Sequence, residues 1–390
     1  MDNAAGKRVK SVRKRRGLSQ RELAGLSGVS LSLIRKLEQG EYGTPRMESF
    51  RKLAVALQVP TMKLVTSGRH EGSSPEYDPS LWAPVQDALE HRATHADALD
   101  DPPTVRGTQG TLDIAAPLFR ADQYAQLAAF LTSLLRDAEE LGKPGRRIRS
   151  QALRMAGRLM VQTRHYNAAE IALTQALELA DSLPDAAAAV STRCWLLMRQ
   201  GRLDTALALG GQWANEIEPR LSRATPDELA SWGLLCLRVS AIAVRNNQDR
   251  DAEFALRMAD SAAAAIGRLH SRSTDLSLFG PASVHLMRAE HAMVRDQPSE
   301  VLRLAEQTPL PLRRPGGSIN NRHLLDVAMA YARTGRFAES FDTLQTLRGG
   351  APEWLPHQRY ARDVLRLVVD GRRTLTADMR SMVQFLRLPL

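Results

Sequence analysis

A short pattern of a turn followed by a helix recurs along the chain and limits the folds open to it. Its copies read GRLDTA at 201–206, NQDRDA at 247–252, DQPSEV at 296–301 and GRFAES at 335–340. The last residue of each copy is equivalent to residue 169 of an earlier pair. These positions, 169, 206, 252, 301 and 340, are separated by 37, 46, 49 and 39 residues. Self-similarity at such periods predicts a stack of helix pairs, because each pair buries its apolar face only against its neighbours.

Small residues stand where the two helices of one pair would cross. Gly157 is followed twelve residues later by Ala169, and then by Leu173 and Ala176. This pattern resembles the tetratricopeptide repeat, although the spacings exceed the ~34 residues of the standard repeat. The resemblance implies an α-solenoid over residues 104–390 that serves ligand sensing and dimerisation. The longer spacings predict longer helices or loops, and an earlier pair around 119–124 starts the stack.

A tetratricopeptide register, projected onto this chain, predicts which side chains face a concave groove. They are Arg154, Arg158, Trp195, Arg199, Arg245, Ser283, Glu290, Arg322 and Arg333. All but the glutamate are candidate ligand-binding residues. An Arg-rich groove with an aromatic wall suits an anionic small molecule or peptide, because guanidinium binds carboxylate through two parallel hydrogen bonds. The alternative is that many of these arginines are solvated or pair with acids on neighbouring helices.

The positive charge of the chain is confined to one end. Residues 1–70 hold 15 Lys or Arg against 5 Asp or Glu, whereas the remaining residues hold equal numbers of each. The formal net charge of +10 therefore belongs to the N-terminal segment. Clustered cations displace the counterions condensed on phosphates, so this asymmetry indicates a module that binds a polyanion, attached to a body with another role.

The basic segment is predicted to form five short helices. Residues 19–22 contain a Ser-x-x-Glu capping box, so a helix begins at Gln20. Gly28 interrupts this helix at a tight turn, because glycine has no Cβ to clash there. Ser30 then caps a helix over 31–39, and a glycine follows as its C-terminal stop.

The spacing of residue types in this segment is specific. Counted from residue 20, positions 5, 9, 10, 15 and 18 are Ala, Gly, Val, Ile and Leu. The segment from LSQRELAGLSGVS to KLAVALQV resembles the Cro/cI-type helix-turn-helix of the xenobiotic-response-element family over about residues 7–65. The resemblance implies a five-helix, lambda-repressor-like domain at 1–68, joined to the solenoid by a linker at 69–103. The chain is therefore predicted to be all-α.

In similar domains the second helix of the motif lies in the major groove of double-stranded DNA, with its N-terminal residues at base edges. The DNA-binding residues that the resemblance implies are Gln20, Ser30, Leu31, Ser32, Arg35, Lys36 and Arg46. Leu31, Ser32 and Lys36 are the expected base readers, whereas Arg35 contacts a base or a phosphate. Gln20 matches a phosphate contact, and Arg46 matches a loop cation near the backbone or minor groove. The alternative is that some of these side chains only cover a solvated face.

The run from Arg13 to Arg16 is expected to neutralise phosphates without base information. Within the linker, one short helix at about 81–91 is expected, with Trp82 packed on the body. His91 and His95 superficially resemble a metal pair, but an acidic tether explains them better, and we predict no metal and no cofactor.

Several classes of protein are excluded. No apolar run reaches the ~18 residues of a membrane helix, and no apolar segment follows the basic N-terminus as in a secretory signal. Cys194 and Cys236 lie in apolar helical patterns and are predicted to be buried thiols in a reducing cytoplasm. The chain lacks phosphate-loop, zinc-protease, nucleophile-elbow and Cys-x-x-Cys motifs, so we predict that it is not an enzyme.

Two functions remain. The first is a cytoplasmic transcriptional regulator that binds an inverted-repeat operator as a homodimer and responds to a small molecule or peptide in its groove. Its domain order is similar to that of Gram-positive quorum-sensing regulators and their actinobacterial relatives. The second is a DNA-tethered scaffold whose solenoid binds a partner protein.

Overall fold

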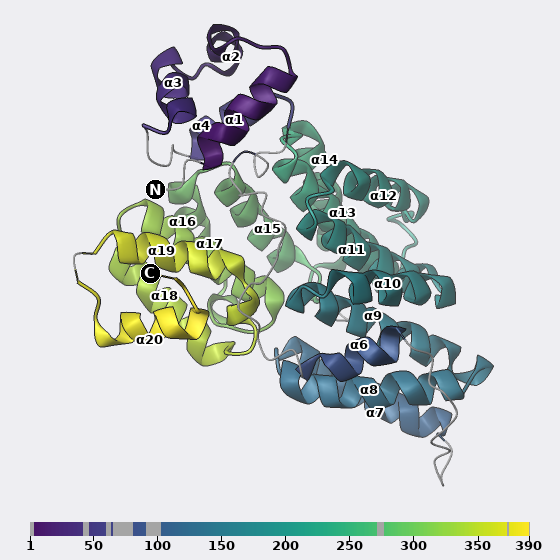
Figure 1. Cartoon of the computed structure of the whole chain (residues 1–390). Coiled ribbons are helices and arrows are strands. Elements are labelled where there is room, and N and C mark those ends of the chain that lie inside the picture. Colours follow the sequence, from purple (N-terminus) through teal and green to yellow (C-terminus); the bar gives the residue numbers. More distant parts are fainter. Residues whose placement is uncertain are drawn as a thin grey trace.

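The computed structural model describes residues 4–41, 47–59, 64, 81–90, 103–270, 277–372 and 374–389. Over these residues the chain is helical, apart from turns and one isolated antiparallel bridge between His270 and Phe279. Figure 1 shows a small N-terminal domain resting on a much larger curved body. The all-α prediction is confirmed.

The N-terminal domain contains α1 (Ala4–Arg15), α2 (Gln20–Ser27), α3 (Leu31–Gln39) and α4 (Met47–Ala56). Its core is built from aliphatic side chains and one aromatic ring, among them Val9, Leu23, Ile34 and Phe50. The fifth helix that we predicted falls largely outside the described residues. Leu64, which belongs to that segment, is buried in the same core.

The body is a stack of antiparallel helix pairs. Its helices are α6 (Ala83–Glu90), α7 (Val105–Arg120), α8 (Tyr124–Glu140), α9 (Arg146–Thr163), α10 (Tyr166–Leu179), α11 (Leu183–Arg199), α12 (Leu203–Glu216), α13 (Pro226–Arg245), α14 (Asp249–Ile266), α15 (Pro281–Val294), α16 (Pro298–Gln307), α17 (Ser318–Arg333), α18 (Phe337–Gly350), α19 (Arg359–Asp370) and α20 (Ala377–Leu386).

Two layers result from this stacking. The odd-numbered helices from α7 to α19 contact one another in order along the stack, and the even-numbered helices pack on their outer side. Helix α6 lies in the segment predicted as a linker and packs against α8 and α10, with Trp82 only 1% exposed. The prediction of a short helix anchored by this tryptophan is confirmed.

In each of the first six pairs, the turn between the two helices contains one residue in the left-handed region of backbone conformations. These residues are Asp122, Arg164, Gly201, Asn247, Asp296 and Gly335, with φ between 57° and 78°. Each precedes the first residue of the second helix by two positions. Glycine, asparagine and aspartate adopt this conformation most easily, which explains their recurrence in the repeated pattern.

Gly157 of α9 permits the close crossing of α9 and α10. A Cβ added to Gly157 would lie 2.7 Å from Leu173 Cγ, closer than two carbon atoms can approach. The predicted role of this small residue at the crossing is confirmed, because glycine leaves the space that the leucine fills.

The stack curves until its first pair touches α17. The Asn321 side-chain amide, on α17, donates to the Asp122 carboxylate at 2.6 Å, although 199 residues separate them. The backbone N–H of Ala125 donates to Glu353 at 2.7 Å in the same region. These two contacts join the first pair to the C-terminal part of the stack, so the face formed by the odd-numbered helices, called the groove below, is bridged at one side.

Candidate DNA-binding surface and ligand groove

The local sequence sets both ends of α3. Ser30 Oγ accepts a hydrogen bond from the backbone N–H of Leu33 at 3.2 Å, and Gly40 ends the helix with φ 80°. At the preceding turn Gly28 has φ 66°, and Ser19 and Glu22 form the predicted capping box on α2. The helix-turn-helix geometry predicted from these residues is confirmed.

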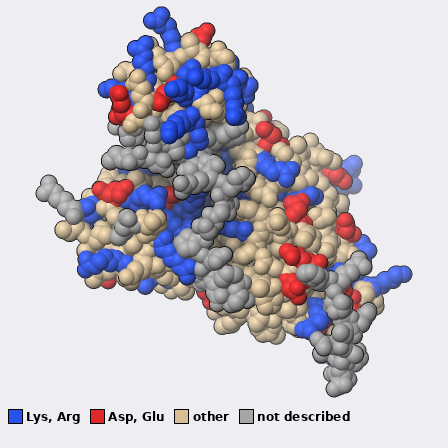
Figure 2. Space-filling model, in the orientation of Figure 1, with Lys and Arg blue, Asp and Glu red and all other residues tan. Residues whose placement is uncertain are grey.

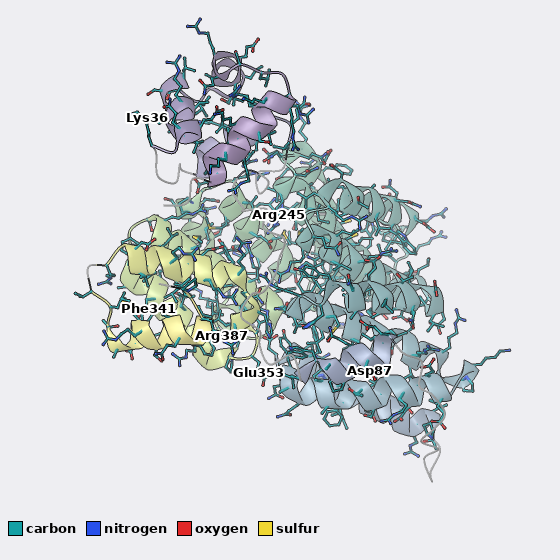
Figure 3. The ribbon with its side chains drawn as sticks, viewed as in Figure 1. Lys36, Asp87, Arg245, Phe341, Glu353 and Arg387 are labelled. Atoms are coloured by element: carbon teal, nitrogen blue, oxygen red, sulfur yellow. The ribbon has the colours of Figure 1, made fainter. Side chains whose placement is uncertain are left out.

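Helix α3 divides into a buried and an exposed face. Ile34 and Leu37 are buried in the domain core. Ser30, at the N-cap, and Ser32, Arg35 and Lys36 are exposed, whereas Leu31 is half-buried. Figure 3 shows Lys36 at the left edge of the N-terminal domain. The exposed face is therefore open to a DNA duplex, while the contacts of individual residues stay predictions.

Arg13 does not belong to the phosphate-binding set that we expected. Its Nε and Nη2 donate to the two carboxylate oxygens of Glu38 at 2.7 and 2.8 Å, and Arg13 is 8% exposed. Burial alone would raise the pKa of Glu38, but the hydrogen bonds from Arg13 and Gln20 outweigh it and hold the pKa below its usual value. Glu38 was not predicted from the sequence; it is a buried acid in a basic domain and needs Arg13 as its partner.

Gln20 is engaged within the domain as well. Its side-chain amide donates one hydrogen bond to Glu38 at 2.8 Å. The amide carries a second N–H, so its predicted contact with phosphate stays a prediction. Arg46, predicted as a loop cation near the DNA, lies outside the described residues.

On the body, one tryptophan is surrounded by guanidinium groups. The Cζ atoms of Arg158, Arg199 and Arg238 lie 6.0, 5.8 and 5.8 Å from the centre of the Trp195 ring. These residues come from α9, α11 and α13, which are consecutive first helices of the stack. Figure 2 shows Lys and Arg gathered both on the N-terminal domain and in the hollow below it.

Arg238 was not predicted as a groove residue, although the sequence holds a signal for it. Arg238 precedes the predicted groove residue Arg245 by seven positions on α13, so two helical turns place both on one face. Its Nε is buried, and within the described residues Arg238 forms no hydrogen bond or salt bridge. Burial lowers the pKa of Arg238, while Glu290 acts in the opposite direction.

Other predicted groove arginines are paired with acids. Arg245 donates to Glu290 of α15 through a short, nearly buried contact, and Arg322 donates to Asp326 at 3.1 Å. Arg322 Cζ also lies 4.4 Å from the centre of the Tyr360 ring. For this part of the groove the alternative interpretation, pairing with acids on the same or neighbouring helices, describes the structure better.

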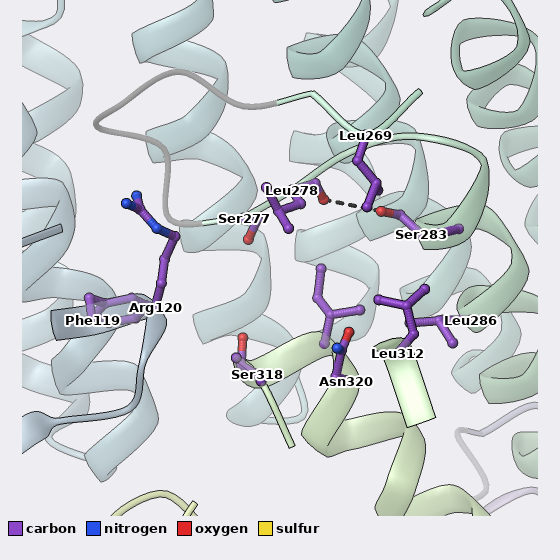
Figure 4. A pocket seen from close by; sticks show the side chains of 14 residues that line it. Phe119, Arg120, Leu269, Ser277, Leu278, Ser283, Leu286, Leu312, Ser318 and Asn320 are labelled. Carbon is purple, nitrogen blue, oxygen red and sulfur yellow. Dashed lines mark hydrogen bonds between the residues drawn. The ribbon is translucent and has the colours of Figure 1, made fainter. Parts of the chain in front are cut away.

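Of the remaining residues predicted to line the groove, Arg333 and Ser283 have partners outside the arginine cluster, whereas Arg154 lies beside it. Arg333 donates to Asp296 at the turn between α15 and α16. Arg154 lies on α9 beside Arg158 and is 5% exposed. Ser283 Oγ donates to the carbonyl oxygen of Leu278 at 3.1 Å, at the wall of a separate pocket (Figure 4).

This pocket of about 80 Å³ lies between the end of α7, the start of α15 and the start of α17. Its wall is mainly apolar and includes Phe119, Leu269, Leu278, Leu286 and Leu312. Leu269 and Leu278 are 45% and 42% exposed, so part of this apolar wall is accessible to solvent.

The cysteines are structural. Cys194 and Cys236 are buried thiols, as predicted, and burial raises the pKa of each to about 12. Within the described ranges, no group of three or more His, Cys, Asp or Glu side chains is arranged to hold a metal ion. His91 and His95 lie outside those ranges. Among the helices that the structure describes, none is both long and apolar enough to span a bilayer.

The N-terminal domain is similar to known DNA-binding domains, since residues 9–64 match the helix-turn-helix family model. The chain carries a helix-turn-helix domain.

Two curated relatives share this domain. The chain is 37% identical over 71 residues to the uncharacterized HTH-type transcriptional regulator RghRB of Bacillus subtilis, which is 18% of this chain and 51% of that protein. It is 38% identical over 55 residues to the HTH-type transcriptional repressor RghR of the same organism, or 14% of this chain and 41% of the repressor. The chain thus spans about half the length of the curated relatives it matches, or less.

Two solved structures align with most of the chain, at lower sequence identity than the curated relatives. Bacillus thuringiensis PlcR, in complex with the peptide PapR7 and DNA, has a TM-score of 0.38 and 10% identity, over 88% of this chain and 99% of PlcR. The PrgX/iCF10 complex has a TM-score of 0.28 and 11% identity, over 99% of this chain and 98% of PrgX.

Proposed function

We propose that the chain is a transcriptional regulator that reads a DNA operator through α3 and is controlled by an anionic effector in the groove. The observation that carries the sensing role is the arginine cluster around Trp195. Two of its cations, Arg158 and Arg238, form no salt bridge to any carboxylate of the residues that the structure describes. A bound anion offsets the repulsion between half-buried like charges, which gives such a site an affinity for anions.

Helix α13 supplies a route from the groove to the DNA-binding domain. Arg245, at the end of α13, pairs with Glu290 in the groove, and Figure 3 shows it below the N-terminal domain. Two residues further on, the Asn247 side-chain amide donates to the carbonyl oxygen of Val59 in the N-terminal domain at 3.2 Å. A shift of α13 in the groove would therefore act directly on the residues that support the domain.

A second contact supports the same coupling. Arg51 of α4 donates to the carboxylate of Asp249, the first residue of α14, at 2.6 Å. Arg295, at the end of α15, donates to Asp249 at 3.2 Å. The N-terminal domain is thus held where the turns after α13 and α15 meet, and Asp249 joins both turns to it.

In the proposed mechanism the effector favours one curvature of the stack. It shifts the equilibrium only by the difference in its affinity for the two curvatures. In a homodimer on an inverted repeat, a changed curvature alters the distance between the two α3 helices and hence the fit to the half-sites. This regulator would act in the cytoplasm, where its operator is found.

The DNA-binding part is tested by incubating the purified full chain with sheared genomic DNA and sequencing the fragments it retains. We expect enrichment of one sequence with inverted symmetry. Retention of fragments without any shared sequence would contradict the proposal.

The sensing part is tested by native mass spectrometry of the protein purified from its own source. A small ligand or peptide retained by the protein supports the regulator. A stoichiometric protein partner, with no small ligand, would favour the DNA-tethered scaffold instead.

A further inference from the structure

The arginine cluster has a cation with no carboxylate and no hydrogen-bond partner in the described part of the chain. Arg238 lies over Trp195 and forms no salt bridge there, and its Nε is buried without a hydrogen bond. Arg158, on the other side of the cluster, donates to Ser277 Oγ at 2.8 Å and forms no salt bridge to a described carboxylate. Both guanidinium groups therefore retain capacity for an anionic acceptor.

The acids that face the cluster are already engaged. Glu290 is held by Arg245, and Asp122 accepts hydrogen bonds from Tyr124 at 2.8 Å and from Asn321 at 2.6 Å. Burial, together with the charges of Arg238 and Arg154, lowers the pKa of Arg158 to about 9. Burial is the first cause of this shift and the neighbouring cations add to it, so an anion placed beside Arg158 would stabilise its charged form.

The cluster adjoins the apolar pocket. Ser277, which accepts from Arg158, lines the pocket, and so does Phe119, whose ring centre lies 5.5 Å from Arg158 Cζ. Beyond these two residues the wall includes the leucine side chains at 269, 278, 286 and 312, together with Arg120, Ser318 and Asn320 (Figure 4). Arg158 therefore stands at the boundary between a cationic and an apolar surface.

We propose that this composite site binds an organic carboxylate with an apolar chain, and that this is the chemical class of the effector. The carboxylate lies between Arg158 and Arg238 beside Trp195, and the chain enters the pocket. Guanidinium matches the planar geometry of a carboxylate, and the apolar wall excludes water from the chain. The assignment of this class rests on the proposed sensing role of the groove.

Two sources present this chemistry. One is a free aliphatic acid, and the other is the C-terminal carboxylate of a short apolar peptide. Either places a single negative charge next to apolar groups, so the site alone fits both, and the experiment separates them.

The test is isothermal titration calorimetry on the full chain without DNA, with decanoate, decanol and acetate as probes. We expect decanoate to bind at least 10-fold more tightly than decanol, which lacks the charge, and than acetate, which lacks the chain. A second pair of probes is an apolar pentapeptide with a free C-terminus and the same peptide as its amide. Tighter binding of the free-acid peptide than of decanoate assigns the peptide source, and the reverse order assigns the aliphatic acid.

Variants locate the binding. Arg238→Gln should weaken the preferred carboxylate at least 10-fold, and Leu278→Asp should weaken it by a similar factor through the pocket. The matched control is Arg336→Gln, because Arg336 Cζ also lies over an aromatic ring, 4.4 Å from the centre of Tyr331, but pairs with Glu339 on the exposed surface. Unchanged circular dichroism in the variants shows that they fold.

The proposal is overturned if none of the carboxylate probes binds, or if Arg336→Gln weakens binding as much as Arg238→Gln. These outcomes do not affect the test for enrichment of operator sequences, because the calorimetry is carried out without DNA. Conversely, carboxylate binding without any sequence enrichment would support this site and contradict the regulatory role.

Discussion

The buried ion pair between Arg13 and Glu38 holds α1 to α3. Removing the guanidinium in Arg13→Ala leaves the Glu38 carboxylate buried without its partner, which should cost about 2–4 kcal/mol of domain stability. Hydrogen exchange of the backbone amides in residues 4–41 measures this loss in the full chain. Arg15→Ala is the control on the same helix, because Arg15 is exposed and its removal should change stability by less than about 0.5 kcal/mol. Equal protection in both variants would show that the pair is not structural.

Asp122 makes the body sensitive to pH. Burial raises its pKa to about 6 from 3.8, despite hydrogen bonds from Tyr124 and Asn321 and the nearby charge of Arg158. The folded state therefore favours the protonated carboxyl. Between about pH 4 and pH 6 this group binds more protons in the folded than in the unfolded chain, so its contribution to stability falls as pH rises, by at most about 1.4 kcal/mol per pH unit.

Asp122→Asn removes this titration. Urea unfolding of the body at pH 4, 5 and 6 should show the difference in stability, wild type minus variant, decreasing with pH. A constant difference across this range would mean that Asp122 has an ordinary pKa.

At the scale of the element, substitutions on α3 and α1 should distinguish base-specific DNA contacts from general phosphate contacts. Ser32→Ala and Lys36→Ala should each cost about 1–3 kcal/mol on the operator and change the preferred bases, because these side chains are expected at base edges. Arg15→Ala should weaken binding to all sequences alike and reduce the salt dependence. Fluorescence anisotropy with operator and random duplexes measures both effects. Equal losses on the two duplexes for Ser32 and Lys36 would remove them as base readers.

The crossing of α9 and α10 depends on Gly157. Gly157→Ala should destabilise the body by about 1–3 kcal/mol, since the new methyl group overlaps Leu173. Gly211→Ala is the matched control within α12, because a Cβ there meets nothing within 4 Å and alanine favours the helix by about 0.5–1 kcal/mol. Thermal unfolding followed by circular dichroism should shift in opposite directions for the two variants.

Local signals in the sequence predicted the elements better than the pairing of charges. Caps, left-handed turn residues and small residues at crossings act within a few positions, so α3 and several of the turns could be located in advance. The partners of charged residues depend on contacts between helices far apart in sequence. Arg13 with Glu38 and Arg333 with Asp296 are separated by 25 and 37 residues, and no local pattern joins them. The division of the predicted groove arginines into paired and unpaired ones could therefore not be read from the sequence.

For the whole molecule, the salt bridge between Arg51 and Asp249 should set the position of the N-terminal domain. An ion pair open to solvent contributes only about 0–1 kcal/mol, so Arg51→Ala should loosen the domain without unfolding the body. Two exposed residues, Lys14 of α1 and Gln212 of α12, are suited to replacement by cysteine for labelling. The native thiols of the chain are buried and should react far more slowly.

Energy transfer between labels at these two sites reports the distance between the domain and the body. Arg51→Ala should broaden the distribution of distances, whereas the control Arg21→Ala, at an exposed position of α2, should leave it unchanged. Identical distributions in the wild type and in Arg51→Ala would mean that other contacts hold the domain.

The coupling between groove and DNA is tested most directly by operator affinity during saturation of the groove. The full chain is titrated with its operator at fixed ionic strength and rising concentrations of the preferred carboxylate, in the wild type and in Arg238→Gln. We predict that the operator dissociation constant changes in the wild type as the groove fills, and stays constant in Arg238→Gln at the same concentrations. A wild-type operator dissociation constant that is unchanged at full saturation of the groove would contradict ligand control of DNA binding.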